Sequence, residues 1–317
     1  MNKFYAIIPI ILIAGIGIGY GIFLTTDYSI DTTAKKVIIL AIQPTAQASD
    51  IESQANELEQ YLEQETDYDI QIYVPTSYAG VVEALRFGKA DVAFMSAWPA
   101  YLAVEKAGAT LEIAEVREVI IDDTLTAETF YYSYWVVPKD SPYNTLEDLR
   151  GKRAAFSSPL STSGYVMPMK TMVETGLIPV EKGKEVDPKS YFSDVVFAGG
   201  YSQAWEALKS NKVDVSIIAG DVSEKLYREV RENTKTIHEQ GPIPSHGVVF
   251  SKEMDSDAKR EIKLAMLKMG KDDSTKQIMR KLVSAIFVGF EETTAEKHLE
   301  NLQSALEMTG LKYTEKV

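Results

Sequence analysis

The chain has 317 residues, of which 45% are hydrophobic and 25% charged, a composition typical of a folded protein with room for two domains. Its formal net charge of −13 disfavours nucleic acid as a partner, because binding to a phosphate backbone needs a surplus of lysine and arginine. Cysteine is absent, which excludes disulfides, thiol nucleophiles, thiolate metal sites and a lipidated N-terminal cysteine.

A long apolar segment, residues 1–24, opens the chain. From Phe4 to Leu24 it carries no charge, and Lys3 precedes it. About 20 such residues cross a bilayer as a helix, whereas a secretory signal has a shorter apolar core and a small-residue cleavage site. No convincing site follows Leu24, so the segment favours an uncleaved anchor over a cleaved signal, with the rest of the chain outside the membrane. Residues 25–36 are polar and predict a linker.

Strands and helices alternate in the next part of the chain. Val37 to Ile42 consists of β-forming and small apolar residues and predicts a buried strand. A helix is expected over Ser49 to Glu65, and a second strand over Ile70 to Val74. This alternation predicts an α/β domain.

An internal near-repeat is the most informative feature. Residues 78–92 and 201–215 share Tyr, Glu, Ala, Leu, a basic residue, Lys, Asp and Val at identical offsets. Each copy predicts a helix that opens at the tyrosine, then a turn and a strand, and each follows a strand–helix–strand segment. The two interpretations are chance recurrence of a common α/β element and two lobes of related fold that present helix N-termini to one cleft.

We place the boundary between the lobes near Tyr134–Lys139, where an apolar strand runs into the turn Asp140-Ser141-Pro142. The expected lobes are residues 37–136 plus 248–317 and residues 137–247. Amphipathic helices are expected at about 255–270, 272–285 and 293–308, packed on the first lobe. Two crossings suit a hinge that closes on a ligand.

The motif Ser161-Thr162-Ser163-Gly164 lies between a predicted strand, Arg153 to Phe156, and a predicted helix, Tyr165 to Thr175. Hydroxyls and backbone N–H groups at a helix start form an anion pocket, helped by the helix dipole. Serine and threonine are equally at home there as ordinary N-caps, so both interpretations stay open.

An enzyme finds little support in the residues. The three histidines, His238, His246 and His298, form no metal-ligand spacing, and no G-x-S-x-G elbow occurs. No cofactor is predicted. The segment Tyr131–Trp135 fits a pocket lining and an aromatic core strand equally well.

The chain resembles the phosphate/phosphite/phosphonate-binding proteins of ABC importers, the PhnD-like type, from Val37 to about Gly270. The stretches that carry the resemblance are Ser77-Tyr78-Ala79-Gly80, Lys139-Asp140-Ser141-Pro142, Ser161-Thr162-Ser163-Gly164, Gly200-Tyr201 and Ile243-Pro244. It implies a two-lobed periplasmic-binding-protein type II fold, α/β, with a hinge and an interlobe cleft. It also implies that Ser161, Thr162 and Ser163 hold the phosphonate oxygens, that Tyr78 faces the ligand, and that Tyr131 flanks it.

The sequence departs from the aminophosphonate-binding relatives at three positions. Tyr201 stands where they place a histidine on the phosphonate, and Asp221 and His246 correspond to their two ammonium-binding carboxylates. His246 is either a donor to an oxyanion or a structural imidazole in the Pro244–Gly247 turn. The departures favour phosphate, phosphite or a small alkylphosphonate over an aminoalkylphosphonate.

These observations together predict a monomeric, extracytoplasmic solute-binding protein of an ABC importer, tethered to the membrane by its N-terminal helix. Its expected partners are a small phosphorus oxyanion and the importer's permease. The alternatives are a membrane-tethered ligand sensor and an enzyme on the same two-lobed fold.

Overall fold

The computed structural model describes residues 35–44, 48–121, 124–222, 224–282, 284 and 286–312. The predicted anchor, Phe4–Leu24, and most of the predicted linker lie outside these residues. No helix among the described residues is long and apolar enough to span a membrane.

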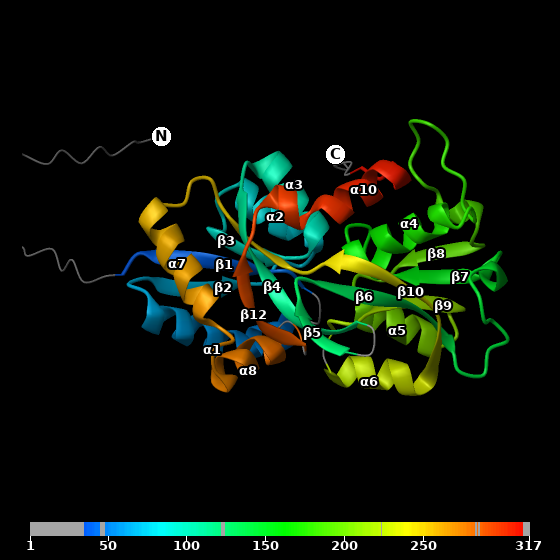
Figure 1. The fold of residues 1–317 in the computed structure, drawn as a ribbon, viewed down its shortest axis with the longest axis horizontal. Helices are drawn as coiled ribbons and strands as arrows, with labels where there is room; N and C mark the ends of the chain where they lie inside the picture. The colour runs from blue at the N-terminus through cyan, green and yellow to red at the C-terminus, as the bar shows by residue number, and fades with distance from the viewer. Residues whose placement is uncertain are drawn as a thin grey trace, which may run out of the picture. The chain divides into compact units, whose positions relative to one another are not determined.

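Two β-sheets organise the described chain (Figure 1). The first has the order β12-β4-β11-β3-β1-β2, with β5 paired to β4, and the second has the order β10-β6-β9-β7-β8. The strands of the first sheet are β1 (Val37–Ile42), β2 (Asp69–Tyr73), β3 (Val92–Met95), β4 (Thr110–Ile121), β5 (Thr124–Glu128), β11 (Gly247–Phe250) and β12 (Phe287–Glu292). The strands of the second are β6 (Phe130–Pro138), β7 (Arg153–Phe156), β8 (Asp194–Phe197), β9 (Val215–Ala219) and β10 (Thr234–Pro244).

Helices cover both sheets on both faces, as an α/β fold requires. Around the first sheet lie α1 (Ala48–Glu65), α2 (Tyr78–Arg86), α3 (Ala97–Ala107), α7 (Ser256–Lys268) and α8 (Asp273–Leu282). Around the second lie α4 (Met167–Glu174), α5 (Tyr201–Lys209), α6 (Glu224–Asn233) and α10 (Glu300–Thr309). Short turns complete the list: η1 (Glu147–Leu149), η2 (Thr162–Val166), η3 (Pro188–Ser190) and α9 (Ala295–His298).

The internal repeat corresponds to the same arrangement in both sheets. In the first, β2, β1 and β3 are parallel and β11 is antiparallel to β3; in the second, β8, β7 and β9 are parallel and β6 is antiparallel to β9. The repeated helices α2 and α5 begin at the repeated tyrosines, Tyr78 and Tyr201. The repeat therefore marks two regions of related topology.

The repeated aspartates serve the fold. Asp91 Oδ2 accepts the backbone N–H of Ile39 at 2.8 Å, and Asp214 Oδ2 accepts that of Arg153 at 2.9 Å. Each carboxylate thus ties the start of the strand that follows the repeated helix, β3 or β9, to its parallel neighbour, β1 or β7.

The crossings between the sheets differ in part from the expected ones. Strand β6 pairs with β9 and β10 along Phe130–Pro138, so the chain leaves the first sheet after Glu128 and the boundary near Tyr134–Lys139 falls inside a strand. Buried Val136 and Val137 hold that segment in the second sheet. The return lies between Pro244 and Gly247, beside the expected one.

Helix α10 does not pack on the first sheet as expected. It packs on α4 and β10 of the second, and Val186 N donates to Thr309 O at 2.7 Å. Its buried residues Leu302 and Ala305 belong to the core cluster that contains the residues of α4. The chain therefore reaches the second sheet again at its C-terminal end (Figure 1).

Candidate functional site

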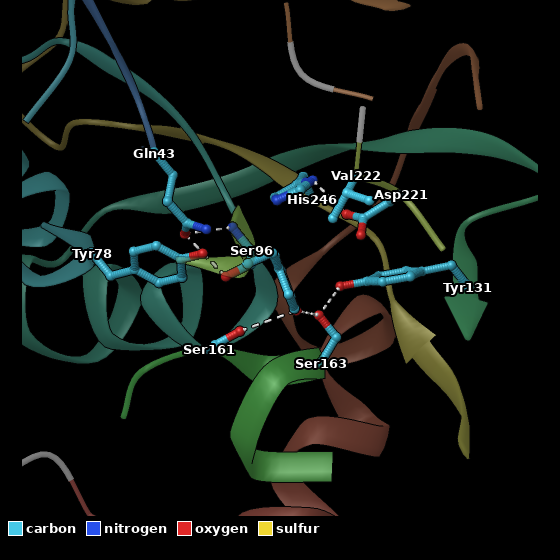
Figure 2. Close-up of a pocket in the computed structure, with 10 residues that line it drawn as sticks. Gln43, Tyr78, Ser96, Tyr131, Ser161, Ser163, Asp221, Val222 and His246 are labelled. Atoms are coloured by element: carbon cyan, nitrogen blue, oxygen red, sulfur yellow. Dashed lines mark hydrogen bonds and ion pairs between the residues drawn. The ribbon is translucent and has the colours of Figure 1, made fainter. Parts of the chain in front are cut away.

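A small enclosed cavity lies between the two sheets, where the carboxyl ends of their parallel strands meet (Figure 2). Its volume is about 10 Å³, roughly the space that one water molecule occupies on this measure. Three lining residues come from the first sheet and its helices: Gln43 after β1, Tyr78 on α2 and Ser96 after β3. The others are Tyr131, Ser161, Ser163, Tyr201, Asp221, Val222 and His246.

Four hydroxyl groups form a connected network at the cavity, and we call Tyr131, Ser161, Ser163 and Tyr201 the hydroxyl cluster. Tyr131 Oη donates to Ser163 Oγ at 2.7 Å, and Ser163 Oγ lies 2.6 Å from Tyr201 Oη. Ser161 Oγ lies 3.4 Å from the same Tyr201 oxygen. These are the short-range contacts of a packed polar network, and each hydroxyl can both donate and accept.

A single turn of π-helix presents the two serines. The N–H groups of Tyr165 and Val166 both point to Ser161 O, at 3.0 and 3.1 Å, which widens the first turn before α4. Such widened turns are frequent at functional sites. Ser161 also caps the turn, since its Oγ accepts from Gly164 N at 3.0 Å, so the N-cap interpretation holds for its present hydrogen bond while the residue also faces the cavity.

Gly164 is required there for close approach. A Cβ at this position would stand 2.0 Å from Ser157 Oγ and 2.8 Å from Ser161 Oγ. A larger residue would push apart the two segments that hold the motif against strand β7.

The tyrosines of the cavity are neutral donors. Burial raises the pKa of Tyr78, Tyr131 and Tyr201 above the usual value for a phenol. Each ring therefore keeps its proton near neutral pH and can offer an O–H to an anion.

On the first-sheet side, Gln43 Oε1 accepts from both the backbone N–H and the hydroxyl of Ser96, each at 3.0 Å. The carboxamide oxygen of Gln43 thus accepts two hydrogen bonds, and the NH₂ group of Gln43 is the part that can donate to a ligand.

Beside the cavity lies a group of charged and polar side chains, and we call Glu115, Arg117, Asp221 and His246 the charged cluster; the sequence pointed to Asp221 and His246 but not to Glu115 and Arg117. Arg117 Nη2 lies 2.6 Å from Glu115 Oε2 and 3.0 Å from Asp221 Oδ2, and it also contacts His246 Nδ1. The guanidinium carbon stands 4.2 Å from the ring centre of Tyr131. Arg117 and Glu115 are wholly buried on β4, whereas Asp221 follows β9, so the ion pair joins the two sheets.

The charges in this cluster stabilise one another. Burial opposes ionisation of Glu115, but Arg117 and His246 outweigh it and hold the pKa of the carboxyl at about 2. Burial likewise opposes the charge on Arg117, while Glu115 and Asp221 raise its pKa above the usual value. The cluster thus contains one permanent cation and a carboxylate on either side of it.

The crossing from β10 to β11 carries His246 into this cluster. Ser245 Oγ donates to Glu115 O at 2.6 Å, and Glu115 N donates to His246 O at 2.9 Å. His298 Nε2 lies 3.0 Å from Ser245 O, and burial lowers the pKa of His298 to about 4. His298 is therefore a neutral donor, and its hydrogen bond to Ser245 O stabilises the crossing from β10 to β11.

Seven of the eight residues expected from the sequence line the cavity, and Thr162 does not. Its Oγ1 accepts the backbone N–H of Trp98 at 2.8 Å, at the start of α3. That N–H has no partner inside its own helix turn, so the threonine satisfies it from the opposite sheet. Thr162 thus holds the two halves together, and its hydroxyl is not among the groups that face the cavity.

The segment Tyr131–Trp135 turns out to serve both expected purposes. Tyr131 lines the cavity, whereas Trp135 is fully buried and stacks on Phe192 with ring centres 6.1 Å apart. The two residues are four apart and lie on the same face of β6, so one buried face reaches the cavity at Tyr131 and continues into the core of the second sheet at Trp135. Among the described residues, no group of His, Asp and Glu side chains is placed to hold a metal ion.

Comparison with known proteins places this chain in a family. Residues 40–298 match the model of a family described as ABC transporter, phosphonate, periplasmic substrate-binding protein. The phosphate-import protein PhnD of Mycolicibacterium smegmatis is 31% identical over 193 residues, which are 60% of this chain and 58% of that protein. The phosphonates-binding periplasmic protein of Escherichia coli is 26% identical over 262 residues, 80% of this chain and 72% of that protein.

A solved structure has the same fold. PhnD1 from Prochlorococcus marinus, in complex with methylphosphonate, superposes with a TM-score of 0.70 at 16% identity and covers 86% of this chain and 97% of that one. The predicted two-lobed α/β fold of a periplasmic binding protein is thereby confirmed.

Proposed function

Since the chain belongs to the family of periplasmic substrate-binding proteins of phosphonate ABC transporters, we propose that it captures a small phosphorus oxyanion in the cavity between its two sheets and delivers it to a permease. The observation that carries this proposal is the convergence of neutral donors from both sheets on one enclosed space. Its relatives include proteins named for phosphate import and phosphonate binding, and a neighbour that holds methylphosphonate.

The donor set suits capture without turnover. An oxyanion taken out of water needs several hydrogen bonds to its charged oxygens, and such bonds are stronger than neutral ones. The hydroxyl cluster, Tyr78 and Gln43 supply them from fixed positions. The family consists of transporter binding proteins rather than enzymes, which agrees with this arrangement.

Binding requires the two halves to separate and close again. A cavity of about 10 Å³ does not admit a phosphorus oxyanion with three or four heavy-atom substituents unless its walls move apart. We propose that the two lobes rotate about the crossings at residues 128–130 and 244–247, and that the Arg117–Asp221 pair and the Thr162–Trp98 hydrogen bond form on closure.

The location follows from the family and from the N-terminal sequence. We propose that the protein works on the outer face of the cell membrane as a monomer, held there by the apolar segment Phe4–Leu24. Tethering would keep the captured ligand near the permease. A protein found wholly in the soluble fraction with an N-terminus near Thr25 would contradict the anchor.

Isothermal titration of the full chain with phosphate, phosphite, methylphosphonate and 2-aminoethylphosphonate tests the proposal. We expect saturable one-to-one binding of at least one of the first three ligands, without any product by phosphorus NMR. Absence of binding to all four ligands would contradict it. A sensor shares the same binding behaviour and is distinguished by a genetic test: loss of the protein abolishes ligand uptake only if it serves an importer.

A further inference from the structure

One oxygen atom of Asp221 has no hydrogen-bond partner among the described residues. Oδ2 pairs with Arg117 at 3.0 Å, whereas Oδ1 is buried and unpaired, and the residue is 6% exposed and lines the cavity. Leaving a carboxylate oxygen without a partner costs free energy, so such an atom in a native site calls for a ligand group that satisfies it.

Asp221 is the exception in a cavity built from donors. The hydroxyl cluster, Tyr78 and the NH₂ group of Gln43 can donate to an anion, whereas a carboxylate can only accept. Figure 2 shows Asp221 on the side of His246 and Tyr131, away from Gln43 and Tyr78. An oxyanion that fills the cavity therefore meets donors on several sides and one group that can only accept, on the side of His246 and Tyr131.

The charges around Asp221 do not remove this conflict. The groups that face it are Arg117 and Glu115 on β4, His246 at the β10–β11 crossing, Tyr78 on α2, Tyr131 on β6 and Tyr201 on α5. Among these only Arg117 is a permanent cation, and two carboxylates already share it. A fully deprotonated anion placed against Oδ1 would meet an uncompensated negative charge.

We infer that Asp221 Oδ1 accepts the hydrogen of a P–OH group, so that the cavity selects phosphorus oxyanions that still carry one acidic proton. This inference rests on the proposed function and specifies which form of the ligand is bound. No covalent bond changes, because the proton stays on the ligand and is shared in a hydrogen bond. Sulfate and alkylsulfonates carry no such proton near neutral pH, so the same contact excludes them.

A pair of ligands separates this inference from a simple charge effect. As the pH rises through their second pKa values, phosphate and methylphosphonate each gain one negative charge. Phosphate keeps a P–OH group afterwards, whereas methylphosphonate loses its last one. Phosphate therefore controls both for the charge of the ligand and for any titration of the protein itself.

The experiment is isothermal titration of the full chain with both ligands, at pH values on either side of the second pKa of methylphosphonate. We expect the ratio of the methylphosphonate Kd to the phosphate Kd to rise about tenfold per pH unit above that pKa. A ratio that stays constant across the range would overturn the inference while leaving the proposed function intact. Failure to bind either ligand at any pH would overturn both.

Asp221→Asn provides the second test, because an amide offers an N–H where the carboxylate offered only an acceptor. In this variant we expect the ratio to lose its pH dependence and sulfate to bind measurably. The matched control is Asp214→Asn, which lies in the same half of the molecule but pairs with Arg153 away from the cavity, and it should keep the wild-type ratio. A pH-dependent ratio in Asp221→Asn would overturn the inference; should that variant not fold, the wild-type ratio decides alone.

Discussion

The two halves of the cavity offer matching positions but not matching chemistry. Each half contributes a residue after its first parallel strand, a tyrosine at the start of its repeated helix and a residue after its third strand. In the first half these are Gln43, Tyr78 and Ser96. In the second they are the serines of the Ser161–Ser163 motif, Tyr201 and Asp221.

The difference lies in charge. The cavity residues of the first half, Gln43, Tyr78 and Ser96, carry no charge, and Ser96 donates to Gln43. The second half carries Asp221, whose partner Arg117 comes from the first sheet and lies behind the cavity. The related topology places hydroxyl groups of both halves at the cavity, and our proposal assigns the choice of ligand to the asymmetry between the halves. The comparison also predicts that the charged cluster governs stability and the hydroxyl cluster governs affinity.

Removing the guanidinium group of Arg117 should cause the largest loss of stability. Arg117→Met leaves Glu115 and Asp221 buried without their counter-charge, and breaking a buried ion pair from one side costs about 3–5 kcal/mol. Urea denaturation of the variant should show a loss of that size in the free energy of unfolding.

The control for this substitution is Arg153→Met, because Arg153 forms the same type of pair with Asp214 at 2.8 Å but its side chain is 42% exposed. Exposed pairs are worth about 1 kcal/mol or less. Similar losses in both variants would contradict the special role of the charged cluster.

Acid should lower the free energy of unfolding through His298, which bonds to Ser245 O beside the charged cluster. The pKa of His298 is about 4 in the folded protein and 6.5 ordinarily, so the unfolded chain takes up the proton first as the pH falls. The neutral His298 contributes about 3 kcal/mol to the free energy of unfolding. This contribution is fully present above pH 6.5 and is lost as the pH falls from 6.5 to 4.

His298→Gln keeps a donor for Ser245 O without a titrating ring, so it should flatten the stability profile in that window. The partly exposed His238 offers the control, and His238→Gln should leave the profile unchanged. An equally steep profile in His298→Gln would show that another group causes the acid sensitivity.

Loss of a hydroxyl from the other cluster should affect binding instead. Ser163→Ala deletes the oxygen that joins Tyr131 and Tyr201, and a hydrogen bond to a charged ligand is worth about 1.5–3 kcal/mol, which is roughly 10- to 150-fold in Kd. Calorimetric titration with phosphate measures this effect.

Ser216→Ala is the matched control, since Ser216 is also a buried serine but bonds to Ala155 O at 3.3 Å and does not line the cavity. We expect its affinity to equal that of the wild type. If Ser163→Ala bound phosphate as tightly as Ser216→Ala, the hydroxyl cluster would not be the binding surface.

Much of the fold, and the positions of Tyr78, Tyr201 and the Ser161–Gly164 motif, could be predicted from the sequence because they depend on local pattern. The repeat gave the position of both tyrosines, and the Ser161–Gly164 motif lies where a strand ends and a helix begins. These features are visible along the chain since their partners lie within one α/β unit. The same pattern could not tell that Thr162 binds a backbone group of the opposite sheet.

The charged cluster was predicted only in part: the family resemblance pointed to Asp221 and His246, whereas Glu115 and Arg117 lie far from them in the sequence and have an ordinary local context. Arg117 lies within a long strand that also carries Glu112, Glu115 and Glu118, and a charged residue in such a strand is normally exposed. One signal was present: Glu115 and Arg117 are two residues apart, which places them on the same face of a strand. Arg117 is packed against Tyr131 and Asp221 of the second sheet and against His246, and such non-local contacts are not visible in one sequence.

The central claim is that both halves grip one phosphorus oxyanion, and a double-mutant cycle on the repeated tyrosines tests it most directly. Phosphate Kd values for the wild type, Tyr78→Phe, Tyr201→Phe and the double variant should show that each hydroxyl contributes roughly tenfold, because each donates to the same charged ligand. The stability of the variants, measured in parallel, should change little by comparison with Arg117→Met. If either single variant bound phosphate as tightly as the wild type while the other lost affinity, the ligand would belong to one half only, and the account would be contradicted.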